Sequence, residues 1–149
     1  ADDRDAVVEL VAQVERLADF CSAHLEHENT FVHPALERAA AGTSQRIAAE
    51  HVEHERDIEA LRAQARALAA CEPGRRAAAC HALYHAMSLF CAHNLAHMLI
   101  EETAHNAVLW AHYDDAQLAA IEAQIVAHLS PAVMMEAMRW MIPALAPSE

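Results

Sequence analysis

The stretch that decides the fold spans residues 44–70 and reads SQRIAAEHVEHERDIEALRAQARALAA. Apolar residues and two histidines recur along it at alternating intervals of four and three, which places them on one face of an α-helix. The positions on this face are Ile47, His51, His54, Ile58, Leu61, Ala65 and Leu68. Residues 44–70 are therefore predicted to form a helix that packs one mixed apolar and histidine face against its neighbours.

The same spacing continues on both sides of this stretch. Residues 5–41 are predicted to form a long helix that ends at Gly42 and is kinked at Pro34, because proline interrupts the backbone hydrogen bonds. Its inner positions are Leu10, Val14, Leu17, Cys21, His24, Glu28, Phe31 and Ala35. Residues 75–112 are predicted to form a third long helix. Its inner positions are Leu83, Met87, Phe90, Asn94, His97, Glu101, Ala104 and Val108.

Two shorter helices are predicted to follow, at residues 115–129 and 131–142. Asp114 or Asp115 can cap the first of them, and Ser130 followed by Pro131 is a typical beginning for the second. The second of these helices has a methionine stripe that we expect to lie in the core or to face a partner. This stripe consists of Met134, Met135, Met138 and Met141.

The composition is typical of one all-α domain covering residues 1–149. Only two Gly and five Pro occur among 149 residues, so few positions favour turns. The dominant residue types, such as Ala, Leu, Glu and Arg, lose the least free energy on entering a helix. Short connections make the neighbouring long helices antiparallel. We therefore expect an up-down antiparallel helical bundle.

Charge and hydropathy exclude several classes of protein. The net charge is −12, Lys is absent and the ten Arg are scattered, which argues against a nucleic-acid surface. No uncharged stretch approaches the length of about 20 residues that a membrane span needs, and no signal peptide is visible, so a cytoplasmic protein without a membrane partner is expected. The cysteines are expected to be buried thiols rather than disulfides. They are Cys21, Cys71, Cys80 and Cys91.

Twelve histidines occur in the chain, and their positions decide which of them can form a site. His24 is followed four residues later by Glu28, and His97 is followed four residues later by Glu101. Residues four apart share a face of a helix, so each pair can direct an imidazole and a carboxylate toward one point. The central helix contributes a third inward imidazole from His51.

Metal binding explains why so many ionisable groups are expected in the core. Buried ionisable groups without a partner cost several kcal/mol each, and a divalent cation compensates them. Nitrogen and oxygen ligands without a thiolate suit iron or manganese, with zinc as a further alternative. Carboxylates from facing helices can also bridge two metal ions. The predicted metal ligands are His24, Glu28, His51, His97 and Glu101, with His54 as an additional candidate.

Each histidine also has a simpler interpretation. A single inward histidine is more often a hydrogen-bonded core residue than a ligand, so only the convergence of several favours a metal. His85 and His93 lie close enough to an inner face to remain open. The other histidines fall outside the inner positions and are expected to be mainly solvated. They are His27, His33, His81, His105, His112 and His128.

These motifs resemble those of the hemerythrin HHE cation-binding family, and the resemblance covers about residues 5–113. The segment HLEHENTFVHPAL, residues 24–36, is similar to the family's second-helix motif, a His-x-x-x-Glu followed by an apolar residue and proline. His51, with Glu50 before it and Ile58 after it, is similar to the third-helix motif. Residues 97–102 are similar to the fourth-helix motif.

The resemblance implies a non-haem iron centre in a four-helix bundle. It implies terminal iron ligation by His24, His51 and His97. It further implies that Glu28 and Glu101 bridge two irons or bind one each. Oxygen carriers of this family have a second histidine where this chain has Glu55, and an acidic bridge where this chain has Glu102. Both positions favour the broader HHE class over a dedicated oxygen carrier.

The family also has a histidine on a helix that precedes the one beginning here. Only acidic residues such as Asp2, Asp3 and Asp5, and no histidine, precede His24 in this sequence. We therefore expect the native chain to begin earlier, with a first helix that is missing here. Without that helix, exposed inner faces would favour association into a homo-oligomer.

The expected function is that of a binding or sensing protein rather than an enzyme. Its di-iron centre would bind O2 or another small diatomic ligand, respond to reactive oxygen or nitrogen species, or hold labile iron. A first alternative is a di-metal oxidoreductase that acts on O2 or peroxide. A second alternative is a metal-free helical interaction module that docks through its last helix, with the methionine stripe and Trp140.

Overall fold

The computed structural model describes residues 4–145, and every regular element in this range is a helix. The predicted all-α class is thus confirmed. The α-helices are α1 Arg4–His27, α2 His33–Ala39, α3 Gln45–Ala70, α4 Arg76–Ile100, α5 Asn106–His112, α6 Asp115–His128 and α7 Pro131–Met141. The π-helical segments are η1 Glu28–Val32 and η3 Glu101–His105, and the short 3-10 segments are η2 Pro73–Arg75 and η4 Ile142–Ala144.

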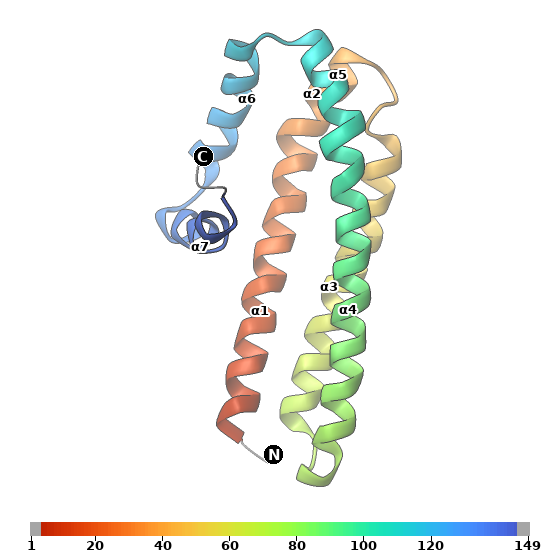
Figure 1. The fold of residues 1–149 in the computed structure, drawn as a ribbon, viewed down its shortest axis with the longest axis vertical. Coiled ribbons are helices and arrows are strands. Elements are labelled where there is room, and N and C mark those ends of the chain that lie inside the picture. Colours follow the sequence, from red (N-terminus) through yellow and green to blue (C-terminus); the bar gives the residue numbers. More distant parts are fainter. Residues whose placement is uncertain (1–3, 146–149) are drawn as a thin grey trace.

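Three long helices lie side by side and run alternately up and down, with α3 packed against both α1 and α4 (Figure 1). The connection before α3 depends on Gly42, whose φ of 87° lies in the left-handed region that glycine tolerates best. The Glu37 carboxylate fixes this turn by accepting hydrogen bonds from the backbone amides of Gly42, at 2.7 Å, and Ser44, at 2.9 Å. The tight turns make neighbouring long helices antiparallel.

The inner face predicted for α3 is confirmed at all seven positions. Each of them is buried in the structure: Ile47, His51, His54, Ile58, Leu61, Ala65 and Leu68. The apolar half of this face packs against α1 and the first half of α4. Together they form the main core, whose buried members are Val14, Ala18, Leu25, Ile58, Leu61, Ala65, Leu68, Leu83 and Phe90. The two histidines of α3 lie in the N-terminal half of the helix, before its apolar core positions, which begin at Ile58.

The inner face of α1 differs from the prediction by about one position. Val14 is buried as expected, but Ala18 and Leu25 are the other buried residues, whereas Leu10 is exposed. Among the long helices, α1 packs mainly on α3. Arg62 of α3 forms ion pairs with the carboxylates of Asp19, at 2.7 Å, and Glu15. These two contacts hold α1 in its observed rotation about its own axis.

Both long helices predicted at 5–41 and 75–112 are interrupted by one π-helical segment each. The first segment, η1, ends two residues before Pro34, which has no backbone N–H to give to the preceding turn. The second, η3, lies in the same position relative to its His-x-x-x-Glu pair without any proline nearby. Proline therefore cannot be the common cause of the two distortions.

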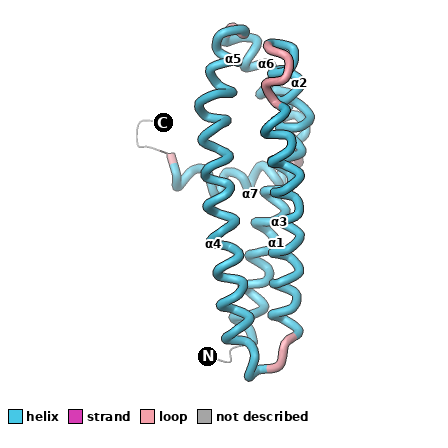
Figure 2. The backbone as a smooth tube through the Cα atoms, turned by 90° about the vertical axis from the view of Figure 1, so that its right-hand side faces the viewer, coloured by secondary structure: helices cyan, strands magenta, loops and turns pink. Residues whose placement is uncertain are grey.

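The last two helices begin as the sequence predicts. Asp114 forms a capping box with Gln117, and the Ser130 hydroxyl accepts a hydrogen bond from the amide of Val133 at 3.3 Å. The helix α7 crosses the direction of the long helices, as the two views together show (Figure 2). The methionine stripe is not core, since Met135, Met138 and Met141 are exposed.

Among residues 4–145, no single helix is long and apolar enough to cross a membrane. The segments Asp115–His128 and Pro131–Ala144 satisfy the length and composition of a span only together, as a pair bent by 118°.

The cysteines are all free thiols, as predicted. Cys21, Cys71 and Cys80 are half-buried, but Cys91 is exposed on α4, so the expectation that every cysteine is buried is wrong.

Candidate metal centre

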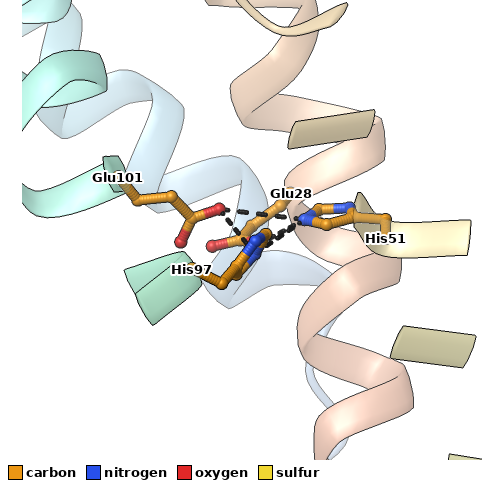
Figure 3. A group of neighbouring side chains, drawn as sticks. All are labelled: Glu28, His51, His97 and Glu101. Carbon is orange, nitrogen blue, oxygen red and sulfur yellow. Dashed lines mark hydrogen bonds and ion pairs between the residues drawn. The ribbon is translucent and has the colours of Figure 1, made fainter. Parts of the chain in front are cut away.

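Four ionisable side chains from three parts of the bundle point toward one another, with one potential ligand atom each within 4.8 Å of all the others (Figure 3). Glu28 is the first residue of η1 and Glu101 is the first residue of η3. His51 comes from α3 and His97 from the last turn of α4. The two histidines are buried, and the two glutamates are largely covered.

The distances within this cluster are short. The Nε2 atoms of His51 and His97 lie 3.1 Å apart, and Nε2 of His97 lies 3.1 Å from Oε1 of Glu101. Nε2 of His51 is 3.4 Å from Oε2 of Glu28 and 3.7 Å from Oε1 of Glu101. Two imidazole nitrogens and two carboxylates thus face one point, an arrangement that could hold a metal ion.

The two carboxylates are incompletely satisfied by the protein. Within the described part of the chain, Oε2 of Glu28 and Oε2 of Glu101 are buried without a well-formed hydrogen bond, although Oε2 of Glu28 has an ion-pair contact of 3.4 Å with Nε2 of His51. A buried carboxylate oxygen without a donor costs free energy, because it has lost its hydration without replacement. A bound cation would compensate both oxygens at once.

Neighbouring side chains orient both imidazole rings. Nδ1 of His51 donates to the side-chain oxygen of Asn29 at 2.9 Å, and Nδ1 of His97 donates to Oε2 of Glu50 at 3.2 Å. A proton held on Nδ1 leaves Nε2 as the nitrogen that can bind a metal, and such supporting acceptors are typical of metal-bound histidines. Both rings are therefore prepared to bind a cation through the nitrogens that face each other.

The charges of the cluster also shift the pKa values of its members. Burial disfavours the charged form of His51, but Glu101 and Glu28 outweigh burial and raise its pKa to about 9. Burial likewise opposes protonation of His97, yet Glu101 and Glu50 raise its pKa. Although burial acts against ionisation of Glu101, its hydrogen bonds to His51 and His97 lower its pKa overall. In the metal-free protein, protons on the imidazoles balance the carboxylates, and a divalent cation would replace them.

The structure brings together four of the predicted ligands and leaves two beside them. His24 is 41% exposed and lies outside the group of four, although its Nε2 is 3.1 Å from Oε1 of Glu28. His54 is buried, with its ring edge-on to that of His97 at a centroid distance of 4.6 Å. Its Nδ1 makes no hydrogen bond to any residue in the range 4–145.

Two histidines that were expected to be solvated are instead buried beside the cluster. His33 is only 7% exposed and His105 only 4%. Burial, together with the nearby charges of His51 and His105, lowers the pKa of His33 to about 4, so its imidazole is neutral. The expectation failed because it assumed regular helices, whereas each π-helical segment shifts the residues after it by about one position. His81, His112 and His128 are exposed as predicted.

Asn29 and Glu50 were also not predicted to support the site. Each lies next to a predicted ligand in the sequence, Asn29 after Glu28 and Glu50 before His51. Their hydrogen bonds reach to a different helix, however, so they depend on how the helices are rotated against each other. Adjacency to a ligand was the only signal in the sequence.

A cavity of about 500 Å³ between α3 and α4 reaches the cluster from one side. His54 and His97 line its inner part, and charged residues such as Arg46, Asp57 and Glu53 line the rest. This cavity gives a small polar molecule or ion access to the edge of His97.

Comparison with known proteins gives no relative from which a role could be transferred. No family model, curated protein or solved structure matches this chain. The function therefore has to be argued from the geometry of the site.

Proposed function

We propose that this protein is a non-haem iron protein that binds its metal between η1, α3 and the junction of α4 with η3, in the manner of the hemerythrin-like proteins its motifs resemble. The observation on which this rests is the convergence of Glu28, His51, His97 and Glu101 within 4.8 Å in a covered part of the bundle. Mixed imidazole and carboxylate ligation without a thiolate favours iron, with manganese and zinc as competitors.

The arrangement of ligands supports a role in binding small molecules at the metal. Four protein ligands leave coordination positions of iron open, and an open position is what a diatomic ligand or a reactive oxygen or nitrogen species requires. His24, paired with Glu28 at the exposed edge, supplies a fifth candidate ligand. The cavity beside His97 supports access from solvent. We therefore favour binding or sensing of O2 or a related species, or holding of labile iron.

Metal analysis tests this proposal most directly. The protein should be purified without an affinity tag, reconstituted anaerobically with Fe(II), freed of excess metal and measured by mass spectrometry. We expect stoichiometric iron in the unaltered chain and a strong loss in His97→Ala, because this ring faces both His51 and Glu101. His112→Ala is the matched control, since His112 is exposed and its Nδ1 donates to the backbone carbonyl of Val108, outside the cluster.

The opposite result is equally clear. Iron, manganese and zinc contents far below one ion per chain after reconstitution would refute the proposal, and so would equal metal contents in His97→Ala and His112→Ala. Circular dichroism of both variants shows whether the helices are intact, so that loss of metal is not confused with loss of fold.

An oxidoreductase is a second candidate because the cavity beside His97 is large enough for a small substrate. If the iron centre catalysed a reaction of peroxide, the amount consumed would exceed the iron content many times. Consumption equal to the iron content would exclude catalysis and leave the binding role.

A metal-free interaction module is the third candidate, and the exposed apolar face of α7 favours it. This face includes Met135 and Met138, and Trp140 and Met141 of the same helix are exposed as well. In that case His24→Ala and His97→Ala would leave the metal content unchanged, because no metal would be present at stoichiometric level in the unaltered protein.

A further inference from the structure

The outward face of α4 differs from that of α3 by its lack of charge. No Asp, Glu, Lys or Arg occurs among residues 77–100, although the chain has a net charge of −12. The outer side of α3, by contrast, exposes charged residues such as Glu53, Arg56 and Glu59. A surface helix of a globular protein typically has charged residues on its outer face, so a long exposed face without them indicates an interaction surface.

The exposed side chains on this face of α4 have the spacing of a coiled-coil seam. Alternating intervals of four and three residues separate six positions, all of them exposed, which we call the α4 seam: His81, His85, Ser88, Ala92, Leu95 and Leu99. The leucines at one end of the seam are 73% and 59% exposed. The small residues in its middle would let a second helix approach closely.

The other end of the α4 seam has two imidazoles that face each other. The Nε2 atoms of His81 and His85 lie 3.1 Å apart, and the ring centroids lie 4.4 Å apart. Two nitrogens that bind one zinc ion tetrahedrally, at about 2.0–2.1 Å each, are about 3.3 Å apart. The two Nε2 atoms are therefore already close to the separation that a shared metal ion requires. Imidazole is a suitable ligand for zinc, copper and nickel.

One chain supplies only half of such a site. Among the residues that the structure describes, no third His, Cys, Asp or Glu forms a group of ligands with His81 and His85. Structural zinc sites almost always have four ligands in a tetrahedral arrangement. A second copy of the chain, related to the first by a two-fold axis along the seam, would supply the same two imidazoles and complete the set.

We propose that His81 and His85 bind a divalent transition-metal ion together with the same two residues of a second copy, so that the ion joins two chains along the α4 seam. The two helices would run parallel, because only then do the histidine ends of both seams meet. In this arrangement the leucines also meet their counterparts and bury apolar surface. The cation offsets part of the repulsion between two chains that each have a net charge of −12.

This shared site is separate from the candidate metal centre. His85 precedes His97 by twelve residues, which corresponds to about 18 Å along α4. His97 is buried inside the bundle, whereas His85 is exposed. The inference goes beyond the proposed function and does not depend on it.

The mass of the particle with and without zinc tests this inference. Sedimentation of the full chain in the presence of a chelator should give the mass of one chain, 16.3 kDa, and excess Zn(II) should double it. His85→Gln should abolish the doubling and lower the bound zinc by about half an ion per chain, because one ion serves two chains. Leu95→Glu should also abolish the doubling, because it places two like charges opposite each other in the seam. His112→Gln, which alters an exposed histidine outside the seam, is the matched control and should keep the doubling.

Two further variants test independence and orientation. His97→Ala removes a ligand of the candidate metal centre and should leave the zinc-dependent doubling unchanged, so that the two sites fail separately. Leu99→Cys, in a chain with Cys91→Ser, tests the parallel arrangement. The introduced thiols meet in a parallel dimer and should form a disulfide with diamide as the oxidant, whereas in an antiparallel dimer they would lie about 27 Å apart.

Several results would overturn the inference. A mass of one chain in excess Zn(II) would exclude the shared site, and an unchanged doubling in His85→Gln would place the association elsewhere. Zinc that depends on His85 but binds without any doubling would restrict the site to one chain and overturn the role of the second copy. A zinc-dependent dimer in which Leu99→Cys does not cross-link would overturn the parallel arrangement.

Discussion

The metal-free protein should lose stability as the pH rises from 6.5 toward 9. Burial opposes protonation of His51, but Glu101 and Glu28 raise its pKa from 6.5 to about 9 in the folded chain. A base with a raised pKa stabilises the fold fully below its unfolded pKa, and this contribution is lost as the pH passes through the folded pKa. The difference of about 2.5 pH units between 6.5 and 9 corresponds to about 3 kcal/mol. The raised pKa of His97 acts in the same direction.

Urea unfolding of the chelator-treated protein measures this effect. Between about pH 6.5 and 8.5, the folded chain keeps the proton of His51 while the unfolded chain loses it. The free energy of unfolding should therefore fall by about 2 kcal/mol over this range. Reductant should be present, and higher pH avoided, because burial raises the pKa of the Cys21 thiol and would add a separate loss. His51→Gln should remove most of the pH dependence. A free energy of unfolding that is constant or rises over this range would refute the reasoning.

Three further predictions concern the metal and the core. Metal affinity should rise with pH, whereas stability falls. Because metal binding releases the proton of His51, the affinity should increase about tenfold per pH unit below the pKa of His51, and competition with a chromophoric chelator measures this increase. Asn29→Ala should weaken metal binding by about 10–100-fold in equilibrium dialysis, because His51 loses the acceptor that orients its ring. The control Gln124→Ala, which removes a side-chain amide hydrogen bond on α6, should leave metal binding unchanged. Leu68→Ala should lower the free energy of unfolding by about 2–5 kcal/mol in urea, with unchanged metal stoichiometry, because Leu68 is fully buried about 25 Å along α3 from His51.

The sequence predicts the helices well because many residues contribute to each of them. The element predicted at 44–70 is observed as Gln45–Ala70, and its inner positions are all buried. Each buried apolar side chain stabilises the same orientation of the helix by about 25 cal/mol per Å² of apolar surface that it buries. No single position therefore determines which face of the helix is buried. The buried face of α1 is less strongly determined by the sequence, because apolar and small residues occupy neighbouring positions, such as Leu17 and Ala18.

The sequence predicts the site only in part because its ligands depend on single positions. The interval of four residues between His24 and Glu28, and between His97 and Glu101, identifies both glutamates, since it is a local property of one helix. The hydrogen bond from His97 to Glu50 joins two helices, so it depends on how they are rotated about their axes. No pattern within one helix contains that information.

The inward histidines after the glutamates were missed for a different reason. Any search for helical periodicity assumes that one turn has the same number of residues throughout, and η1 and η3 violate this assumption where the carboxylates lie. Irregular backbone persists only where its surroundings determine it strongly. Two helices that share the pattern His-x-x-x-Glu-x-Thr are distorted at the same position relative to it, and only one of them has a proline nearby. The two segments share a largely covered carboxylate that faces imidazoles and a threonine two residues after it, so these features, and not proline, are common to both distortions.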